Sequence, residues 1–138
     1  MAAFHTTYLG SLRCENLHTQ SGTHIITDAP TDNQGMGSAF SPTDLCALSL
    51  TTCIVTTMGI YAQSQGFELL AAEAKTFKHM ANDPRRIARI EIQLAVTLAA
   101  DATDRMEEGI RRVVHLCPVA RSLHPDIHQD VQLTVLRR

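Results

Sequence analysis

The clearest pattern in the chain is the alternation of apolar and polar side chains over residues 90–98, which read IEIQLAVTL. A two-residue period predicts a half-buried strand, and residues 130–138 repeat it. Two runs within residues 4–28, FHTTYLGSLRC and HIIT, are rich in β-branched and aromatic residues and predict short strands. We expect Arg13 to lie in the first of these strands.

Residues 47–62 show a different pattern, ALSLTTCIVTTMGIYA, which contains no charged side chain. Before this run, Ser41 is a good helix N-cap, Pro42 suits the first helical position, and Asp44 places an acid in the first turn. Gly66 is a stop signal. The sequence therefore predicts a long helix that is apolar or hydroxylated nearly all round, and hence central and buried.

The rest of the chain predicts a hairpin, two shorter helices and a final strand. Residues 68–98 flank the turn signal NDPRR and form the hairpin. Apolar residues from Met106 onwards recur on one face of a second helix, which we expect to end at Cys117 because Pro118 disfavours helix there. Pro118 then begins a short third helix. This order predicts an α+β fold with an antiparallel sheet, in one domain of residues 1–138.

Composition narrows the classes of function. The chain has 138 residues, 44% of them hydrophobic, and a net charge of −2, which argues against a nucleic-acid-binding protein. The uncharged stretch 45–67 is long enough for a membrane helix, but it holds eight Ser, Thr and Gln residues and no basic residue flanks its start. No signal-peptide pattern is visible in MAAFHTTYLG. We therefore expect a cytoplasmic protein that binds neither nucleic acid nor membrane.

Four cysteines are the main candidates for chemistry: Cys14, Cys46, Cys53 and Cys117. They include no C-x-x-C pair, and the seven histidines show no metal-ligand spacing, so no metal site is expected. Cys46 and Cys53 are separated by about 10 Å along the predicted helix, too far for a disulfide. We interpret Cys14 and Cys46 as packing residues.

Cys53 and Cys117 are the pair most able to meet. Cys117 is predicted on the core side of its helix and at the start of the next, where a helix N-terminus would lower the pKa of its thiol. The helix around Cys53 offers no cation, so one must come from Arg13, Arg85 or Arg86. The residues alone leave two interpretations open, a redox pair or two packed core thiols.

Two sequence blocks carry a resemblance to a known family. SPTDLCALSLTTC and CPVARSLHP, with TDAP…NQGMG before them, resemble the OsmC/Ohr proteins, thiol-dependent peroxidases that act on organic hydroperoxides. The resemblance covers nearly the whole chain. It implies antiparallel sheets packed around a long central helix, and an intertwined homodimer whose sites lie at the subunit interface.

The resemblance also implies roles for three residues. Cys53 would be the peroxidatic thiolate, Cys117 the resolving thiol, and Arg13 the cation that pairs with thiolate and peroxide, while a solvated strand arginine is the alternative for Arg13. No cofactor is expected; an external dithiol, with a lipoyl-type dithiol as one candidate, would reset the pair. The alternative function is a weakly active or non-catalytic relative that binds a hydrophobic ligand or senses oxidants through the same cysteine pocket.

One position departs from the family pattern. The peroxidase branch carries a glutamate ten residues before its reactive cysteine, where it pairs with the arginine. Here that position is Thr43, and the nearest acid is Asp44. Nine residues on an ideal helix turn Asp44 half a turn away from Cys53, so we interpret Asp44 as a helix-start acid. The departure points to an OsmC-like branch and leaves the substrate range open.

Overall fold

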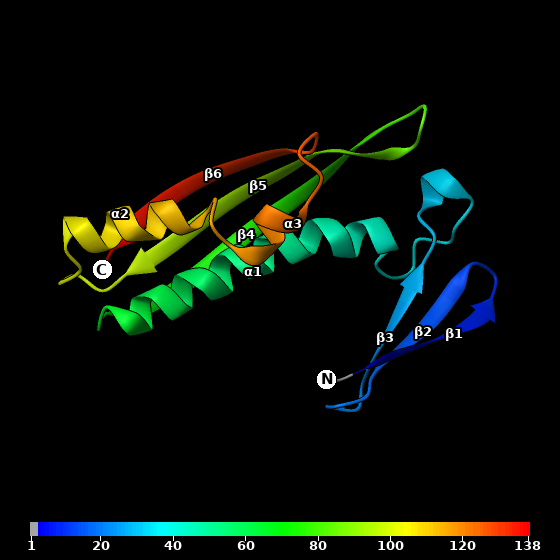
Figure 1. The fold of residues 1–138 in the computed structure, drawn as a ribbon, viewed down its shortest axis with the longest axis horizontal. Helices are drawn as coiled ribbons and strands as arrows, with labels where there is room; N and C mark the ends of the chain where they lie inside the picture. The colour runs from blue at the N-terminus through cyan, green and yellow to red at the C-terminus, as the bar shows by residue number, and fades with distance from the viewer. Residues whose placement is uncertain (1–2) are drawn as a thin grey trace. The chain divides into compact units, whose positions relative to one another are not determined.

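The computed structural model describes residues 3–138 and contains two three-stranded sheets, with a long helix between them in sequence and two shorter helices before the last strand (Figure 1). The chain divides into two compact units, one ending at Cys46 and the other running from Ala47 to Arg138. The predicted α+β class is confirmed, and so is the order of strands, long helix, hairpin, helices and final strand.

The N-terminal unit is an antiparallel sheet in the order β1-β2-β3. Its strands are β1 (Phe4–Gly10), β2 (Arg13–His18) and β3 (Thr23–Asp28), followed by the short 3-10 helix η1 (Thr31–Asn33). The run FHTTYLGSLRC is broken by a turn in which Gly10, Ser11 and Leu12 all have positive φ angles. The expectation that Arg13 lies in the first strand is therefore wrong: the turn, which Gly10 enters at φ 85°, makes Arg13 the first residue of β2.

The hairpin between β2 and β3 fixes which residues face each other. Gly22 closes its turn by donating its backbone N–H to the carbonyl of His18 at 2.8 Å. His18 pairs with Thr23, and the register runs without a slip to the last pair, Arg13 opposite Asp28. An arginine and an aspartate thus face each other at the end of the sheet where the following loop begins.

Helix α1 (Pro42–Ser64) begins and ends as predicted. The Ser41 hydroxyl accepts the backbone N–H of Asp44 at 3.1 Å, and the Asp44 carboxylate accepts the backbone N–H of Ser41 at 2.9 Å. These two bonds satisfy amide groups that the first turn leaves unpaired. At the other end, Gly66 takes a left-handed conformation with φ 73°.

Burial of α1 is confined to one stripe. The buried residues recur every three or four positions and are Ala47, Leu50, Thr51, Ile54, Met58 and Ala62. Thr52, Thr56 and Ile60 on the other side are exposed, so the expected burial on all sides is not found within the chain.

Among the described residues, α1 is the one helix that is apolar and long enough to cross a membrane. Core helices of soluble proteins pass the same test.

The C-terminal sheet is mixed. It consists of β4 (Leu69–Ala81), β5 (Arg86–Leu98) and β6 (His128–Arg137), in that order. β4 and β5 form the predicted antiparallel hairpin, whereas β6 pairs with β5 in parallel, which corrects the expected antiparallel sheet. Residues 99–127, which contain two helices, form the long crossover that a parallel pair requires.

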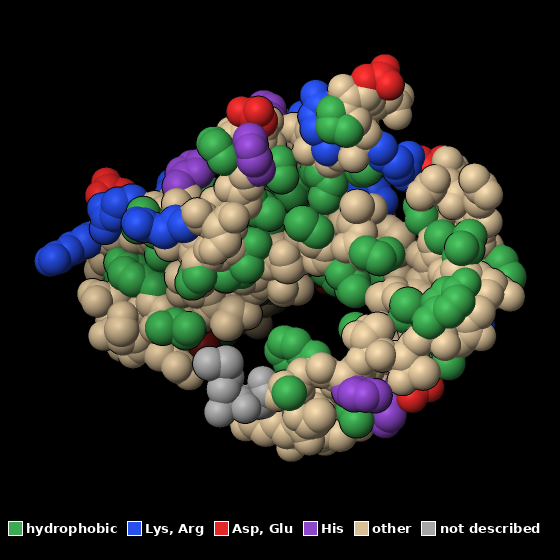
Figure 2. Space-filling model, turned by 45° about the vertical axis from the view of Figure 1, so that its right-hand side comes forward, with side chains coloured by type: hydrophobic (Ala, Val, Ile, Leu, Met, Phe, Trp, Pro, Cys, Tyr) green, Lys and Arg blue, Asp and Glu red, His purple; other side chains and the backbone are tan. Residues whose placement is uncertain are grey.

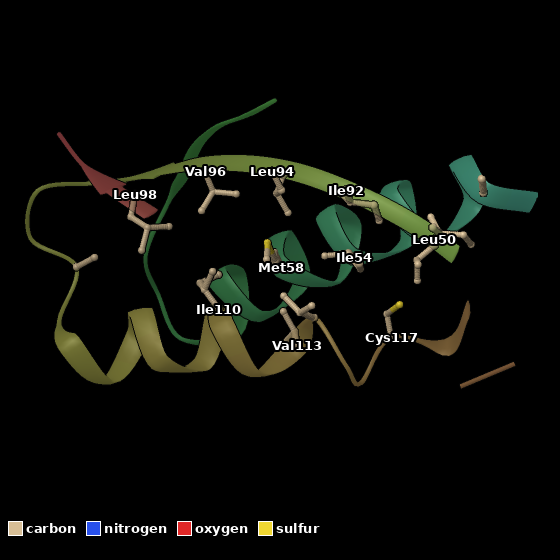
Figure 3. Close-up of a cluster of buried hydrophobic side chains, with 14 residues drawn as sticks. Leu50, Ile54, Met58, Ile92, Leu94, Val96, Leu98, Ile110, Val113 and Cys117 are labelled. Atoms are coloured by element: carbon tan, nitrogen blue, oxygen red, sulfur yellow. The ribbon is translucent and has the colours of Figure 1, made fainter. Parts of the chain in front are cut away.

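The core of the C-terminal unit lies between β5 and the helices α1 and α2 (Asp104–Val113) (Figure 3). The alternating residues of β5 point into it as predicted, from Ile90 to Leu98. Gly109 of α2 contributes by its lack of a side chain, since a Cβ there would lie 1.9 Å from the hydroxyl of Tyr61. The close contact between α1 and α2 thus requires glycine.

Helix α2 ends at Val113, four residues before the predicted end at Cys117. Pro118 cannot donate a backbone hydrogen bond, and its ring would clash with the carbonyl of Val114 if the helix continued. The chain instead makes a turn, and Cys117 takes an extended conformation as the N-cap of α3 (Pro118–Ser122). The predicted short third helix with Pro118 first is confirmed, but Cys117 does not lie on the face of α2.

Candidate active site

The C-terminal unit brings Cys53 and Cys117 together. Cys53 lies in the middle of α1 and is partly buried, whereas Cys117 is fully buried beside the end of the core that holds Leu50 and Ile54 (Figure 3). Cys53 packs against the buried core cluster that contains Cys117, the two thiols are close enough for Cys53 to raise the pKa of Cys117, and both are free. Two residues 64 positions apart in sequence therefore meet as predicted, without any covalent link between them.

The surroundings of Cys117 raise the pKa of its thiol above the usual value of 9.0. Burial is the main cause, and the adjacent Cys53 thiol adds to it. The backbone N–H of Ala120, which the Cys117 sulfur accepts at 3.4 Å, acts in the opposite direction but does not prevail. The predicted lowering of this pKa by a helix N-terminus is thus wrong, because a single turn of helix does not offset burial in an apolar core.

The three candidate cations have different surroundings. Arg86 uses its guanidinium to bond the carbonyls of Asn82 and Pro84 at 2.9 and 2.8 Å, which ties it to its own turn. Arg85 is exposed in the same turn. Arg13 belongs to the N-terminal unit, where its side chain is 34% exposed and faces Asp28. Of the three, Arg13 alone sits beside a buried carboxylate.

The Arg13–Asp28 pair is an ion pair without a hydrogen bond. Arg13 Nε and Asp28 Oδ2 are 3.7 Å apart, and Asp28 is 1% exposed. The same carboxylate oxygen accepts the backbone N–H of Ser38 at 3.0 Å and the Ser38 hydroxyl. Hydrogen bonds from Ser38, together with the charge of Arg13, lower the pKa of Asp28 even though burial opposes them.

Asp44 performs the structural role that the sequence predicts for it. Its carboxylate accepts the Ser41 backbone N–H and so caps α1. The hydroxyl of Thr43 is 3.2 Å from that of Ser41, within the same cap. The start of α1 is thus organised around helix capping.

The other candidate residues have surroundings of their own. The unbroken course of α1 keeps Cys46 two turns away from Cys53. Cys14 lies in β2 opposite Thr27. His115 is exposed. Within residues 3–138, no group of three or more His, Cys, Asp or Glu side chains is placed to hold a metal ion.

Asp28 and Ser38 are the residues that sequence reasoning missed. The motif TDAP places Asp28 at the end of a strand, where it reads as part of a polar loop. The signal that could have found it is the turn before Gly22, because a hairpin closed there puts Arg13 and Asp28 directly opposite. Ser38 carried no such signal, since its contact depends on the path of the loop from residue 29 to residue 41.

The comparisons with known proteins agree on one family. The family model described as OsmC-like protein matches residues 35–132. A crystal structure from Psychrobacter arcticus, provisionally described as an osmotic stress induced and detoxification response protein, is 42% identical to this chain. It covers 97% of this chain and 96% of its own, with a TM-score of 0.85. No curated protein matches the chain at the level of sequence.

Two more distant crystal structures share the fold. An organic hydroperoxide resistance protein from Legionella pneumophila is 17% identical, has a TM-score of 0.65, and covers 99% of this chain and 96% of its own. The organic hydroperoxide resistance protein OhrB of Bacillus subtilis is 15% identical, has a TM-score of 0.62, and covers 97% and 98%. Identities this low show a common fold and no more.

Proposed function

The chain belongs to the OsmC-like protein family, and from that premise we propose that it is a cysteine-based peroxidase that reduces organic hydroperoxides to alcohols. The observation that carries this proposal is the proximity of the free thiols of Cys53 and Cys117. Two thiols that lie near each other can form a disulfide once their Cα atoms are within about 7 Å. The names of the Legionella and Bacillus structures, organic hydroperoxide resistance proteins, support the choice of substrate.

In the first step, the Cys53 thiolate attacks the distal oxygen of the hydroperoxide, ROOH. The new S–O bond forms as the O–O bond breaks, so Cys53 is oxidised to a sulfenic acid while the substrate leaves as an alkoxide. The alkoxide takes up a proton and departs as the alcohol ROH. Cys53 is the better nucleophile of the pair because Cys117 is fully buried and its pKa is raised.

In the second step, Cys117 attacks the sulfenic sulfur of Cys53. The S–S bond forms, the sulfenic hydroxyl leaves, and the proton released by Cys117 converts it to water. An external dithiol, for which a lipoyl-type dithiol is a candidate, then reduces the disulfide by thiol exchange. The sum is ROOH plus dithiol giving ROH, water and an oxidised reductant.

Arg13 supplies the positive charge in this proposal. A guanidinium beside the thiolate and the peroxide stabilises the reactive anion and the charge that develops on the leaving oxygen. The support for this role is the resemblance of the sequence blocks and the exposed third of the Arg13 side chain, which is open to a ligand. The apolar residues packed around Cys53 and Cys117 favour a substrate with an organic tail over hydrogen peroxide.

We also propose that the protein is a cytoplasmic homodimer. Large apolar side chains reach the surface in this chain, as the green patches of Figure 2 illustrate. Phe4 is 76% exposed, and Ile60 on the uncovered side of α1 is 61% exposed. Side chains of this kind are typical of surfaces that another chain covers. Light scattering after size exclusion tests the stoichiometry, and a monomer at micromolar concentration would refute it.

Peroxide consumption tests the enzymatic proposal directly. Wild type with tert-butyl hydroperoxide and dithiothreitol should give many turnovers, whereas Cys53→Ser should give none above the uncatalysed rate. Cys46→Ser, on the same helix, is the matched control and should keep wild-type activity. A non-catalytic ligand binder or oxidant sensor would react with one equivalent of peroxide and then stop, which would exclude the enzyme.

Intact mass separates the roles of the two thiols. One equivalent of hydroperoxide should lower the mass of the wild type by about 2 Da, as expected for a disulfide, and raise that of Cys117→Ser by about 16 Da, as expected for a sulfenic acid. If Cys117→Ser still forms the intramolecular disulfide, another cysteine resolves Cys53 and the assignment of Cys117 is wrong.

A further inference from the structure

Asp28 is the one carboxylate of the described chain that is fully buried. A buried carboxylate destabilises a fold unless hydrogen bonds or an opposite charge compensate for the lost water. The end of β3 would tolerate an uncharged residue more easily. The contacts of Asp28 with its neighbours must therefore explain why this position holds a carboxylate.

The loop that follows β3 holds the carboxylate in place. Ser38 donates both its backbone N–H and its hydroxyl to Asp28 Oδ2. The backbone N–H of Asp28 in turn donates to the carbonyl of Phe40 at 3.0 Å. The Asp28 side chain and backbone are thus both fixed by residues ten to twelve positions later. Its lowered pKa keeps it ionised at neutral pH.

Across the sheet, this fixed negative charge faces the Nε edge of Arg13. The closest approach is 3.7 Å, and Nε is the nitrogen involved. Arg13 Nε and Asp28 Oδ1 are buried, and neither has a hydrogen-bond partner within residues 3–138. Since Nε is buried, the exposed third of the Arg13 side chain lies on its other atoms.

This geometry differs from that of an ion pair built for stability. A stabilising arginine–carboxylate pair uses two parallel hydrogen bonds from the guanidinium fork. Arg89 comes closer to that pattern, donating from both Nε and Nη2 to Asp130 at 3.2 and 2.6 Å. In Arg13 the terminal nitrogens form no hydrogen bond within the described chain and are left for another partner.

We propose that Asp28 is the positioning residue of Arg13: its carboxylate, fixed by Ser38, holds the Nε edge of the guanidinium and leaves the terminal nitrogens to bind the thiolate and the peroxide. This inference rests on the proposed function, which gives Arg13 its partner.

The pH profile of Cys53 alkylation by iodoacetamide tests this role. In Asp28→Asn, the guanidinium loses its anchor and stabilises the Cys53 thiolate less well, so the midpoint of the profile should move to higher pH. Direct electrostatics predict the opposite, since removing a nearby negative charge favours the thiolate. A midpoint that moves to lower pH or stays unchanged would overturn the proposal. Turnover of tert-butyl hydroperoxide should fall about tenfold in kcat/KM.

A double mutant separates positioning from any other effect. Arg13→Gln should shift the midpoint further than Asp28→Asn and lower kcat/KM about a hundredfold. In the Arg13→Gln background, Asp28→Asn should then add nothing, because its effect is transmitted through Arg13. An additional shift of similar size would show that Asp28 acts independently. Glu15→Gln, two residues along the same strand face, is the matched control and should behave as wild type.

If Asp28→Asn fails to fold, Ser38→Ala provides a second variant for the same alkylation experiment. It retains the carboxylate, removes one hydroxyl bond, and should move the alkylation midpoint in the same direction by a smaller amount. A folded Ser38→Ala protein with a wild-type profile would contradict the proposal. Circular dichroism at the assay temperature establishes that each variant is folded.

The outcomes distinguish the two proposals. If Arg13→Gln shifts the profile while Asp28→Asn does not, the positioning role alone fails. If Arg13→Gln leaves the profile unchanged, the role of Arg13 in the proposed function fails, and the inference fails with it. If alkylation responds as expected but the wild type does not turn over peroxide, the positioning role stands and the peroxidase proposal is wrong.

Discussion

Cys117 in the C-terminal unit and Asp28 in the N-terminal unit are both fully buried acids, and their surroundings shift them in opposite directions. The pKa of Cys117 is raised, mainly by burial in an apolar core. The pKa of Asp28 is lowered, mainly by hydrogen bonds from Ser38 and with help from Arg13. Equal burial thus stabilises a neutral thiol in one unit and a charged carboxylate in the other.

The difference follows from the composition of the two units. The C-terminal core offers Cys117 aliphatic side chains and weak backbone donors, the N–H groups of Ala120 and Val119. The N-terminal sheet offers Asp28 two donors from one serine and a facing guanidinium. Burial alone therefore does not set the ionisation of a site residue. In the proposed enzyme, the neutral Cys117 thiol therefore lies in the C-terminal core, whereas the charged side chains of Arg13 and Asp28 belong to the smaller N-terminal unit.

The largest expected effect concerns the pH dependence of disulfide formation. The Cys117 thiolate carries the second step, and the raised pKa of Cys117 lies above 9.0. Its thiolate fraction, and with it the rate, should therefore rise about tenfold per pH unit, or about a hundredfold from pH 7 to pH 9. Stopped-flow measurement of disulfide formation after a peroxide pulse checks this.

An external thiol provides the control for that profile. In Cys117→Ser, free cysteine added as the resolving thiol should give a rate that levels off near pH 8.5, its own pKa. If the wild-type rate also levels off there, Cys117 behaves as an exposed thiol, and the contrast with Asp28 disappears.

The next effect tests the packing of α1 against α2 in the core to which Cys117 belongs. Gly109→Ala should lower the free energy of unfolding by about 2 kcal/mol, because its methyl group would overlap the ring of Tyr61. This loss outweighs the gain of about 1 kcal/mol from better helix propensity. Chemical denaturation measures it. Glu108→Ala, exposed on the same helix, should change stability by less than about 0.5 kcal/mol. Equal stability of the two variants would show that α1 and α2 pack less closely.

A smaller effect concerns acid stability in the N-terminal unit. Because the pKa of Asp28 is lower in the folded protein than its usual 3.8, the carboxylate stabilises the fold above that pH, and this contribution is lost as the pH falls through the folded pKa. Asp28→Asn should therefore be less stable than wild type at pH 7, with the gap closing below about pH 4. Urea midpoints from pH 7 to pH 3 measure the gap. A gap independent of pH would mean that the aspartate is neutral when folded.

The smallest effect is expected at a solvent-exposed ion pair. Arg111 bonds Glu107 one turn earlier on α2 at 3.1 Å, with 48% of its side chain exposed. Arg111→Ala should lower stability by less than about 0.5 kcal/mol, because Glu107 keeps a second partner in Arg137. Thermal unfolding checks this. A larger loss would indicate that surface charge, and not only burial, differs between the units.

The candidate site could be predicted in part from the sequence. Local rules identified the start of α1, since Ser41, Pro42 and Asp44 act through contacts within one turn. The pairing of Cys53 with Cys117 was also predicted, although Cys117 lies at the start of α3 and not on the face of α2 from which the pairing was argued. The carboxylate partner of Arg13 did not, because it is decided by hairpin register and by a loop contact ten residues away.

The fold, like the candidate site, could be predicted only in part. The alternation over residues 90–98 identified β5 correctly, but it cannot tell whether a later strand runs parallel or antiparallel to it. Helix α2 ends earlier than predicted because the ring of Pro118 would clash with the helical turn before it. The spacing of apolar residues along one helix face contains no information about this clash. The direction of a strand and the end of a helix depend more on tertiary contacts and backbone geometry than on the periodicity of apolar residues.

The parallel pairing of β6 with β5 has a consequence for how the chain reaches its native state. β6 can dock only after residues 99–127 have closed a long loop, and Cys117 lies within that loop. Contacts of such high sequence separation form late and slow folding. We therefore expect the two thiols to meet in one of the last folding steps, so that a nascent or partly unfolded chain carries separated cysteines with no resolving partner.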